Sequence, residues 1–85
     1  MFEITKTKQY KKDEKKYSQI IGSRLIKMEN ELRENPLNGS DSIKKLTGFE
    51  PPYRYRIGQY RIFYDVIAKT VNLITIRPRG EAYKK

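Results

Sequence analysis

The 85-residue sequence predicts a single α+β domain, residues 1–85, with helices packed on one face of a mostly antiparallel sheet. Three observations predict this two-layer fold. Apolar side chains between residues 17 and 32 recur every three or four residues, which is the period of a helix. From residue 53 onward they recur every second residue, which is the period of a strand. The dipeptide Gly58-Gln59 interrupts this second pattern and is typical of a tight hairpin turn.

The first half of the chain predicts one strand followed by helix. Residues 2–5 alternate in polarity and predict the first strand, and a lysine-rich helix begins near residue 8. An apolar stripe follows at helical spacing: Tyr17, Ile21, Leu25, Met28 and Leu32. Gly22-Ser23 is a candidate bend, so residues 8–34 form either one helix or two. Asn35-Pro36 ends the helix, because the residue before a proline is driven out of the helical region, and residues 36–42 form a loop.

The second half predicts three consecutive strands, at residues 53–57, 60–67 and 71–77. The turn at Gly58-Gln59 pairs Arg56 with Arg61. One face of this hairpin is then apolar and packs against the helices; it carries Tyr55, Ile57, Tyr60, Ile62, Tyr64 and Val66. The opposite face carries Arg54, Arg56, Arg61, Phe63 and Asp65.

The length of the next turn decides where Arg77 lies. A three-residue turn at residues 68–70 pairs Phe63 with Thr75 and Arg61 with Arg77. A two-residue turn would place Arg77 on the core face, where burial of its charge is costly. We therefore predict the three-residue turn, which aligns Arg56, Arg61 and Arg77 across three neighbouring strands.

Directly opposed like charges destabilise a sheet, so this arginine row needs a cause other than folding. Guanidinium groups match phosphate oxygens in a bidentate manner, and the row therefore indicates an anion-binding face. The alternative is a solvated strand face whose arginine side chains are splayed apart. Arg79, Lys84 and Lys85 extend the basic character beyond the strand, and Tyr83 either contacts a base or phosphate or pins the tail to the core.

Composition limits the chemistry that is available. The chain has 19 Lys+Arg against 10 Asp+Glu, a net charge of +9, which favours an anionic partner. It has no Cys and no His, so thiol chemistry and the commonest metal ligands are excluded and we expect no metal and no cofactor. No apolar run approaches the roughly 20 residues of a membrane span, and the start does not resemble a secretory signal, so we expect a cytoplasmic protein. The lysine-rich helix, residues 8–16, is either a solvated face or a grip on ribosomal RNA.

From residue 2 to 85 the sequence resembles the RelE/ParE superfamily of toxins from type II toxin–antitoxin systems. The resemblance is carried by Leu46-Thr47-Gly48, by the hairpin Tyr53-Arg54-Tyr55-Arg56-Ile57 and Gly58-Gln59-Tyr60-Arg61-Ile62-Phe63-Tyr64, and by the tail from Arg77 to Tyr83. It implies the RelE-like, microbial-ribonuclease type of fold, with the order β-α-α-β-β-β.

The resemblance implies two branches of function. RelE-like members are ribosome-dependent endoribonucleases (mRNA interferases), whereas ParE-like members act on DNA gyrase without nuclease activity. The tail is more similar to the first branch, because Arg77, Arg79 and Tyr83 occupy the places of a catalytic Arg and a terminal catalytic Tyr. A third possibility is a non-catalytic RNA- or ribosome-binding module. The implied partners are a cognate antitoxin, the ribosome and mRNA.

The resemblance also implies a role for each basic residue of the hairpin and tail. Arg54 and Arg56 match a basic pair implicated in substrate binding and in activation of the 2′-hydroxyl. Arg61 matches an Arg that stabilises the phosphate, and Arg77 one that supports the leaving group, with Arg79 as the alternative if the last strand shifts. Tyr83 matches a Tyr that stacks on or orients the substrate.

The sequence departs from the family pattern at the basic pair, where both residues are Arg. With a pKa above about 12, Arg is a poor proton acceptor. A nuclease built on these residues would act mainly by charge stabilisation and in-line positioning. Only Asp65, Glu81 and Tyr83 are left nearby as groups that could move protons.

Overall fold

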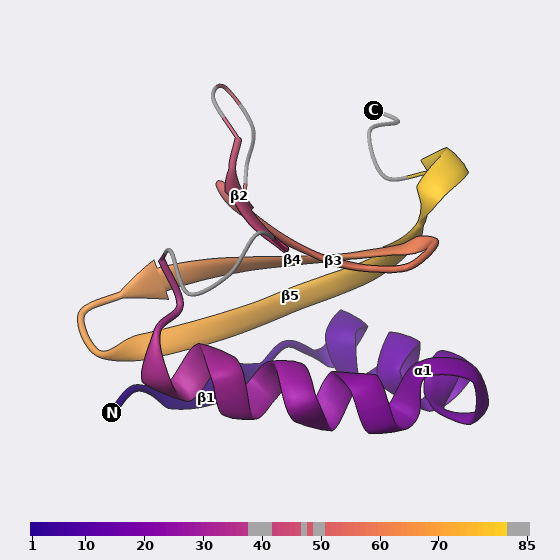
Figure 1. Ribbon diagram of the computed structural model, residues 1–85, viewed down its shortest axis with the longest axis horizontal. Coiled ribbons are helices and arrows are strands. Elements are labelled where there is room, and N and C mark those ends of the chain that lie inside the picture. Colours follow the sequence, from indigo (N-terminus) through magenta and orange to yellow (C-terminus); the bar gives the residue numbers. More distant parts are fainter. Residues whose placement is uncertain (38–41, 47, 49–50, 82–85) are drawn as a thin grey trace.

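The computed structural model describes residues 1–37, 42–46, 48 and 51–81. Along this part of the chain the elements are β1 (Glu3–Lys6), α1 (Lys8–Glu34), β2 (Ile43–Lys45), β3 (Tyr53–Ile57), β4 (Tyr60–Ile67), β5 (Thr70–Pro78) and the 3-10 turn η1 (Arg79–Glu81). The strands form one sheet in the order β1-β5-β4-β3-β2. The β1–β5 pair is parallel and the other pairs are antiparallel, and α1 covers one face (Figure 1). The predicted two-layer α+β fold is confirmed.

The sequence left undecided whether residues 8–34 form one helix or two. The structure has one helical segment, α1, with a break in it. Ile21 has non-helical backbone angles (φ −126°, ψ 16°) beside Gly22, and the two halves run in different directions (Figure 1). At the start, Thr7 Oγ1 accepts a hydrogen bond from the Tyr10 backbone N–H, as an N-cap does. At the end, the Asn35 backbone N–H donates to the Glu31 carbonyl, and Pro36 follows directly.

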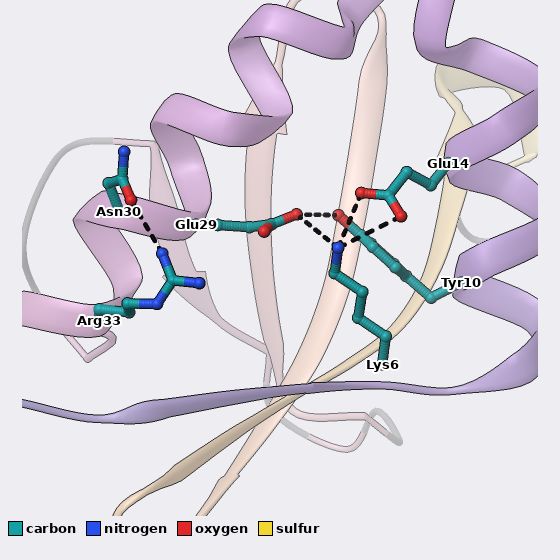
Figure 2. A network of polar contacts seen from close by, with 6 residues as sticks. All are labelled: Lys6, Tyr10, Glu14, Glu29, Asn30 and Arg33. Carbon is teal, nitrogen blue, oxygen red and sulfur yellow. Dashed lines mark hydrogen bonds and ion pairs between the residues drawn. The ribbon is translucent and has the colours of Figure 1, made fainter.

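A polar cluster joins the two halves of α1 to β1. Lys6 Nζ lies 3.0 Å from Glu14 Oε2 in the first half and 3.4 Å from Glu29 Oε2 in the second. The Tyr10 hydroxyl also points at Glu29, at 3.5 Å (Figure 2). These contacts satisfy polar groups that the bend would otherwise leave buried and unpaired.

The core lies between α1 and the sheet and follows the predicted faces. The helix contributes Tyr10, Ile21, Leu25, Met28 and Leu32, and the sheet contributes Tyr55, Ile57, Ile62, Tyr64, Val71, Leu73 and Ile76. Tyr17, Tyr60 and Val66 pack against this core while partly exposed. The core is rich in aromatic rings, and Tyr64 donates a hydrogen bond to the Pro36 carbonyl at 2.5 Å.

Strand β2 was not predicted from the sequence. Its three residues, Ile43–Lys45, pair with Tyr53–Tyr55 at the edge of the sheet. A segment of one apolar residue followed by two exposed lysines is too short to show the alternation of a strand. The segment pairs as a strand because β3 offers an open edge. The predicted order β-α-α-β-β-β is therefore corrected to β-α-β-β-β-β.

The β4–β5 turn has two residues, Ala68 and Lys69, so the predicted three-residue turn is wrong. The predicted pairing of Arg61 with Arg77 is nevertheless present, because a β-bulge at Ile74 shifts the register by one residue. The bulge lets Val71 and Leu73 face the core on one side of it and Ile76 on the other. A regular strand with a three-residue turn would have turned Val71 and Leu73 outward.

The start of α1 closes the edge of β5 where β1 ends. Thr7 Oγ1 donates a hydrogen bond to the carbonyl of the bulged Ile74, at 2.6 Å. Six residues later the buried carboxylate of Asp13 accepts hydrogen bonds from the Ile76 backbone N–H at 3.0 Å and from Thr75 Oγ1 at 2.7 Å. These contacts replace the missing strand neighbour and fix the part of β5 that carries Arg77.

Candidate anion-binding face

The sheet face opposite α1 carries a row of three arginines. Arg56 of β3 pairs with Arg61 of β4, which pairs with Arg77 of β5. Residues paired directly across strands lie about 5 Å apart at Cα and point to the same face. The alignment predicted from the sequence is present, and the bulge at Ile74 produces it.

Arg61 lies at the centre of this row and is held in place by its own hairpin. Its Nη1 donates to the Gly58 carbonyl at 2.9 Å and to the Tyr60 carbonyl at 3.2 Å. Gly58 has a φ of +55°, the left-handed region that the first residue of this turn requires, so the carbonyl position depends on glycine.

The electrostatic environment of Arg61 is strongly positive. Partial burial lowers the pKa of its guanidinium, and the charges of Arg54, Arg56 and Arg79 lower that pKa further. A group whose pKa falls because cations surround it gains stability when an anion arrives. These four guanidinium groups, which we call the arginine cluster, form the strongest candidate for an anion site in the described part of the chain.

Arg77 and Arg79 differ in their relation to this cluster. Arg77 is exposed and opposite Arg61 in the register, yet the Arg77 charge is not among those that lower the Arg61 pKa. Arg79 begins η1, and its backbone N–H donates to the Gln59 carbonyl at 2.6 Å, which brings the end of β5 back onto the β3–β4 turn. The strand register therefore favours Arg77 as the residue that binds an anion together with Arg61, whereas the effect on the Arg61 pKa favours Arg79.

The sequence missed one basic residue on this face. Lys44 of β2 pairs with Arg54, so an exposed lysine extends the basic face across a fourth strand. The only signal for it in the sequence is a lysine pair after a lone isoleucine, which no strand pattern distinguishes from a loop.

The structure does not place several of the predicted site residues beside the arginine cluster. Tyr83, Lys84 and Lys85 lie outside the described residues. Asp65 lies four residues along β4 from Arg61, which is about 13 Å, and accepts a hydrogen bond from the Val66 backbone N–H. Asp65 is therefore not a proton acceptor for chemistry at Arg61.

Two further properties concern the described residues as a whole. Within them, no three side chains of the metal-ligating types gather into a cluster. None of their helices combines the length and the apolar character that crossing a bilayer would need.

Comparison with known proteins gives the family. A model described as "ParE toxin of type II toxin-antitoxin system, parDE" matches residues 4–83, almost the whole chain. The chain belongs to this toxin family. The predicted membership of the RelE/ParE superfamily is confirmed, and the protein is a toxin of a type II toxin–antitoxin system. A search of curated proteins gives no significant match.

Solved structures agree with this toxin fold. The chain is similar to RelE of the RelB–RelE antitoxin–toxin complex of Methanococcus jannaschii, with 26% identity, a TM-score of 0.77, and 93% of this chain and 94% of that one covered. It is also similar to the archaeal RelE–RelB complex of Pyrococcus horikoshii (24% identity, TM-score 0.74, 95% and 98% covered). A mutant toxin from Helicobacter pylori has the same fold (20% identity, TM-score 0.81, 98% and 100% covered).

Proposed function

We propose that this toxin is a ribosome-dependent endoribonuclease of the RelE type, an mRNA interferase that arrests translation in the cytoplasm. The observation that carries the proposal is the arginine cluster: Arg61 with the charges of Arg54, Arg56 and Arg79 around it. The four guanidinium charges repel one another in the free protein. A phosphate, which becomes more negative during the reaction, neutralises them.

The reaction is an attack by a ribose 2′-hydroxyl on the adjacent phosphorus. The 2′-oxygen forms a bond to phosphorus and gives up its proton, and the bond to the 5′-oxygen breaks and that oxygen takes up a proton. The products are a 2′,3′-cyclic phosphate, which can open to a 3′-phosphate, and a 5′-hydroxyl end. This chain contributes charge and placement: Arg61 faces the phosphate oxygens, Arg54 and Arg56 hold the ribose side, and Arg77 or Arg79 stabilises the leaving oxygen.

The proton carriers are not supplied by the described arginine face. Arginine side chains are poor proton acceptors, and Asp65 is remote from Arg61. Glu81, Tyr83 and groups of the ribosome are the remaining candidates, in keeping with a toxin that acts only on translated messages.

Brief induction followed by mapping of mRNA 5′ ends tests the proposal. Wild-type toxin should leave codon-phased 5′-hydroxyl ends on translated messages only. Arg61→Ala and Arg77→Ala should lower cleavage by about 10²–10³-fold, the usual loss when one preorganised charge is removed. Lys69→Gln is the matched control, since Lys69 lies in the turn at the far end of the β4–β5 hairpin. Full translation arrest in both arginine variants would refute the site.

A second candidate function follows from the family model, which is that of ParE toxins. A toxin that inhibits DNA gyrase by protein binding would leave mRNA intact and induce a DNA-damage response. A non-catalytic ribosome binder would leave mRNA uncut and would not induce a DNA-damage response, so the same induction experiment separates all three.

We also propose that the toxin binds a cognate antitoxin, since the M. jannaschii and P. horikoshii neighbours are toxin–antitoxin complexes.

A further inference from the structure

A hydroxyl and a carboxylate that the reaction above does not use form a pair at the β5 edge of the arginine face. Thr75 of β5 donates a hydrogen bond from its Oγ1 to Asp13 Oδ2 of α1, at 2.7 Å. The Asp13 side chain is buried, whereas Thr75 is partly exposed. The Thr75 hydroxyl is thus the surface end of a polar pair whose carboxylate lies inside.

The strand register places Thr75 beside the arginine row. Thr75 lies two residues before Arg77 on β5, so both side chains point to the same face of the sheet. Its cross-strand partner is Phe63 of β4, which pairs in turn with Arg54 of β3. Arg61, the partner of Arg77, is therefore a diagonal neighbour of Thr75, at about 7–8 Å between Cα atoms.

This spacing fits one nucleotide of an RNA chain. In an in-line attack the 2′-oxygen approaches to about 3 Å from phosphorus, with the leaving 5′-oxygen on the opposite side. A phosphate held by Arg61 then has its ribose over Arg54 and Thr75, which lie in the same cross-strand row. Its leaving oxygen lies on the other side, towards Arg79 at the start of η1. A neutral hydroxyl at the ribose position, on a face of arginines, is suited to a 2′-hydroxyl.

The directions of the hydrogen bonds decide which way a proton moves. Thr75 Oγ1 gives its proton to Asp13, so it presents lone pairs to a ligand, and a ribose 2′-hydroxyl can donate to them. Asp13 Oδ2 also accepts from the Ile76 backbone N–H at 3.0 Å, and its Oδ1 accepts from Gln9 Nε2 at 2.9 Å. These bonds hold the carboxylate in place, and the carboxylate in turn orients the Thr75 hydroxyl.

We infer that Thr75, oriented by Asp13, receives the ribose 2′-hydroxyl of a bound RNA strand. The 2′-hydroxyl donates a hydrogen bond to Thr75 Oγ1, and the arginine face thereby distinguishes RNA from DNA. In the reaction the 2′-proton passes to Thr75 Oγ1 while the Thr75 proton passes to Asp13 Oδ2. The 2′-oxygen bonds to phosphorus, the bond to the 5′-oxygen breaks, and that oxygen takes up a proton from water. Asp13 afterwards returns its proton to water through Thr75.

Proton transfer through this pair rests on the proposed function, whereas recognition of the 2′-hydroxyl does not. Asp13 joins Glu81, Tyr83 and groups of the ribosome as a candidate proton carrier, and it lies behind the arginine face rather than on it. Asp13 and Thr75 are 62 residues apart in the sequence, so no local pattern indicates that they meet.

Fluorescence titration with labelled hexanucleotides tests recognition. The probes are hexauridylate and its 2′-deoxy and 2′-O-methyl forms, which differ only at the 2′ position. The wild type should bind hexauridylate about fivefold more tightly than the other two, which is the usual effect of one hydrogen bond. Thr75→Ser keeps the hydroxyl and should keep this preference, whereas Thr75→Val should lose it. Thr70→Val, at the start of β5, is the matched control and should behave as the wild type.

Asp13→Asn separates recognition from proton transfer. The asparagine carbonyl can accept the same bonds from Thr75 and Ile76, and the Gln9 amide can turn to face the new NH₂ group, so the preference for RNA should remain. Cleavage of translated messages should fall about 10²-fold, because an amide does not take up the proton. Thr75→Val should lower cleavage to a similar extent with the carboxylate left in place, and Thr75→Ser should restore it. Backbone amide spectra show whether each variant is folded.

The inference is overturned if the wild type binds the three probes alike, if none of them binds at millimolar concentration, or if Thr75→Val retains the preference for RNA. Proton transfer is overturned if Asp13→Asn or Thr75→Val cleaves at the wild-type rate. If the wild type cleaves no message while its preference for RNA depends on Thr75, the proposed function and proton transfer both fail and recognition of the 2′-hydroxyl stands.

Discussion

Glu29 is a carboxylate whose surroundings disfavour its charge, although it lies beside a lysine. Burial raises the pKa of Glu29, the Lys6 ammonium lowers it, and the nearby Glu14 raises it again, with a net upward shift. Burial tends to lower the pKa of Lys6, but the hydrogen bond to Glu14 and the Glu29 charge outweigh it, so the Lys6 pKa is raised. The bend of α1 is therefore stabilised by a cluster in which one lysine serves two carboxylates (Figure 2).

This cluster predicts a pH dependence of stability. Since the folded-state pKa of Glu29 lies above its ordinary value of 4.5, the folded state holds the proton more tightly than the unfolded state. The contribution of Glu29 is fully present below that value and is lost as the pH rises through the folded-state pKa. Glu29→Gln removes this titration, so the wild-type free energy of unfolding should fall relative to that of the variant between about pH 4 and about pH 7.

Urea denaturation of both proteins across this range measures the difference. Glu34→Gln, an exposed carboxylate at the end of α1, is the control and should show no such trend. If the wild type instead becomes more stable relative to Glu29→Gln as the pH rises, Lys6 has a larger effect on the Glu29 pKa than burial has.

At the level of elements, the β4–β5 hairpin carries the most unusual backbone of the described residues. Ala68 opens the turn with a φ of +55°, in the left-handed region that disfavours side chains with a Cβ. The equivalent position of the β3–β4 turn is Gly58, also at +55°. The two hairpins thus need the same conformation, and only one of them has the residue that adopts it easily.

Ala68→Gly should therefore stabilise the toxin by about 1 kcal/mol, because relief of left-handed strain exceeds the added flexibility of the unfolded chain. Thermal or urea unfolding measures the change. Lys69→Gly, in the next position of the turn, should destabilise. Equal effects of the two changes would show that the strain at Ala68 is not significant.

At the scale of the whole molecule, which carries a net charge of +9, many of the basic side chains gather in three regions of the described structure. The arginine cluster is one, and a surface hollow lined by Arg24, Lys27 and Arg56 shares Arg56 with it. Five exposed lysines (Lys8, Lys11, Lys12, Lys15 and Lys16) occupy the first half of α1. Like charges at this density favour an anionic partner over self-association.

Salt dependence distinguishes the contribution of each region to RNA binding. For single-stranded RNA the logarithm of the affinity should fall linearly with the logarithm of the salt concentration, by about 0.7 per phosphate contact. Arg61→Gln should reduce this slope by about 0.7, since it removes one such contact. Lys69→Gln should leave the slope unchanged. Fluorescence titration of a labelled oligonucleotide at several salt concentrations measures both, and an unaltered slope for Arg61→Gln would place the phosphate elsewhere.

The sequence determined the layers of this fold, because period is a local property. The helical stripe from Tyr17 to Leu32, the alternation along the β3–β4 hairpin and the Gly58-Gln59 turn were predicted correctly. The register of Arg56 with Arg61 follows from a tight turn alone. The family, too, was predicted from the order of these segments.

Tertiary structure decided what depends on contacts between distant segments. The bulge at Ile74 forms because Val71, Leu73 and Ile76 must all reach the core, and Thr7 and Asp13 of a remote segment hold the β5 edge in that shape. The spacing of these three apolar residues, two and then three, was a sign of the bulge that strand alternation alone does not reveal. Strand β2 likewise forms where β3 leaves an edge of the sheet open. Local periodicity sets which face a side chain takes, whereas the position of a bulge or an edge is set by packing over the whole domain.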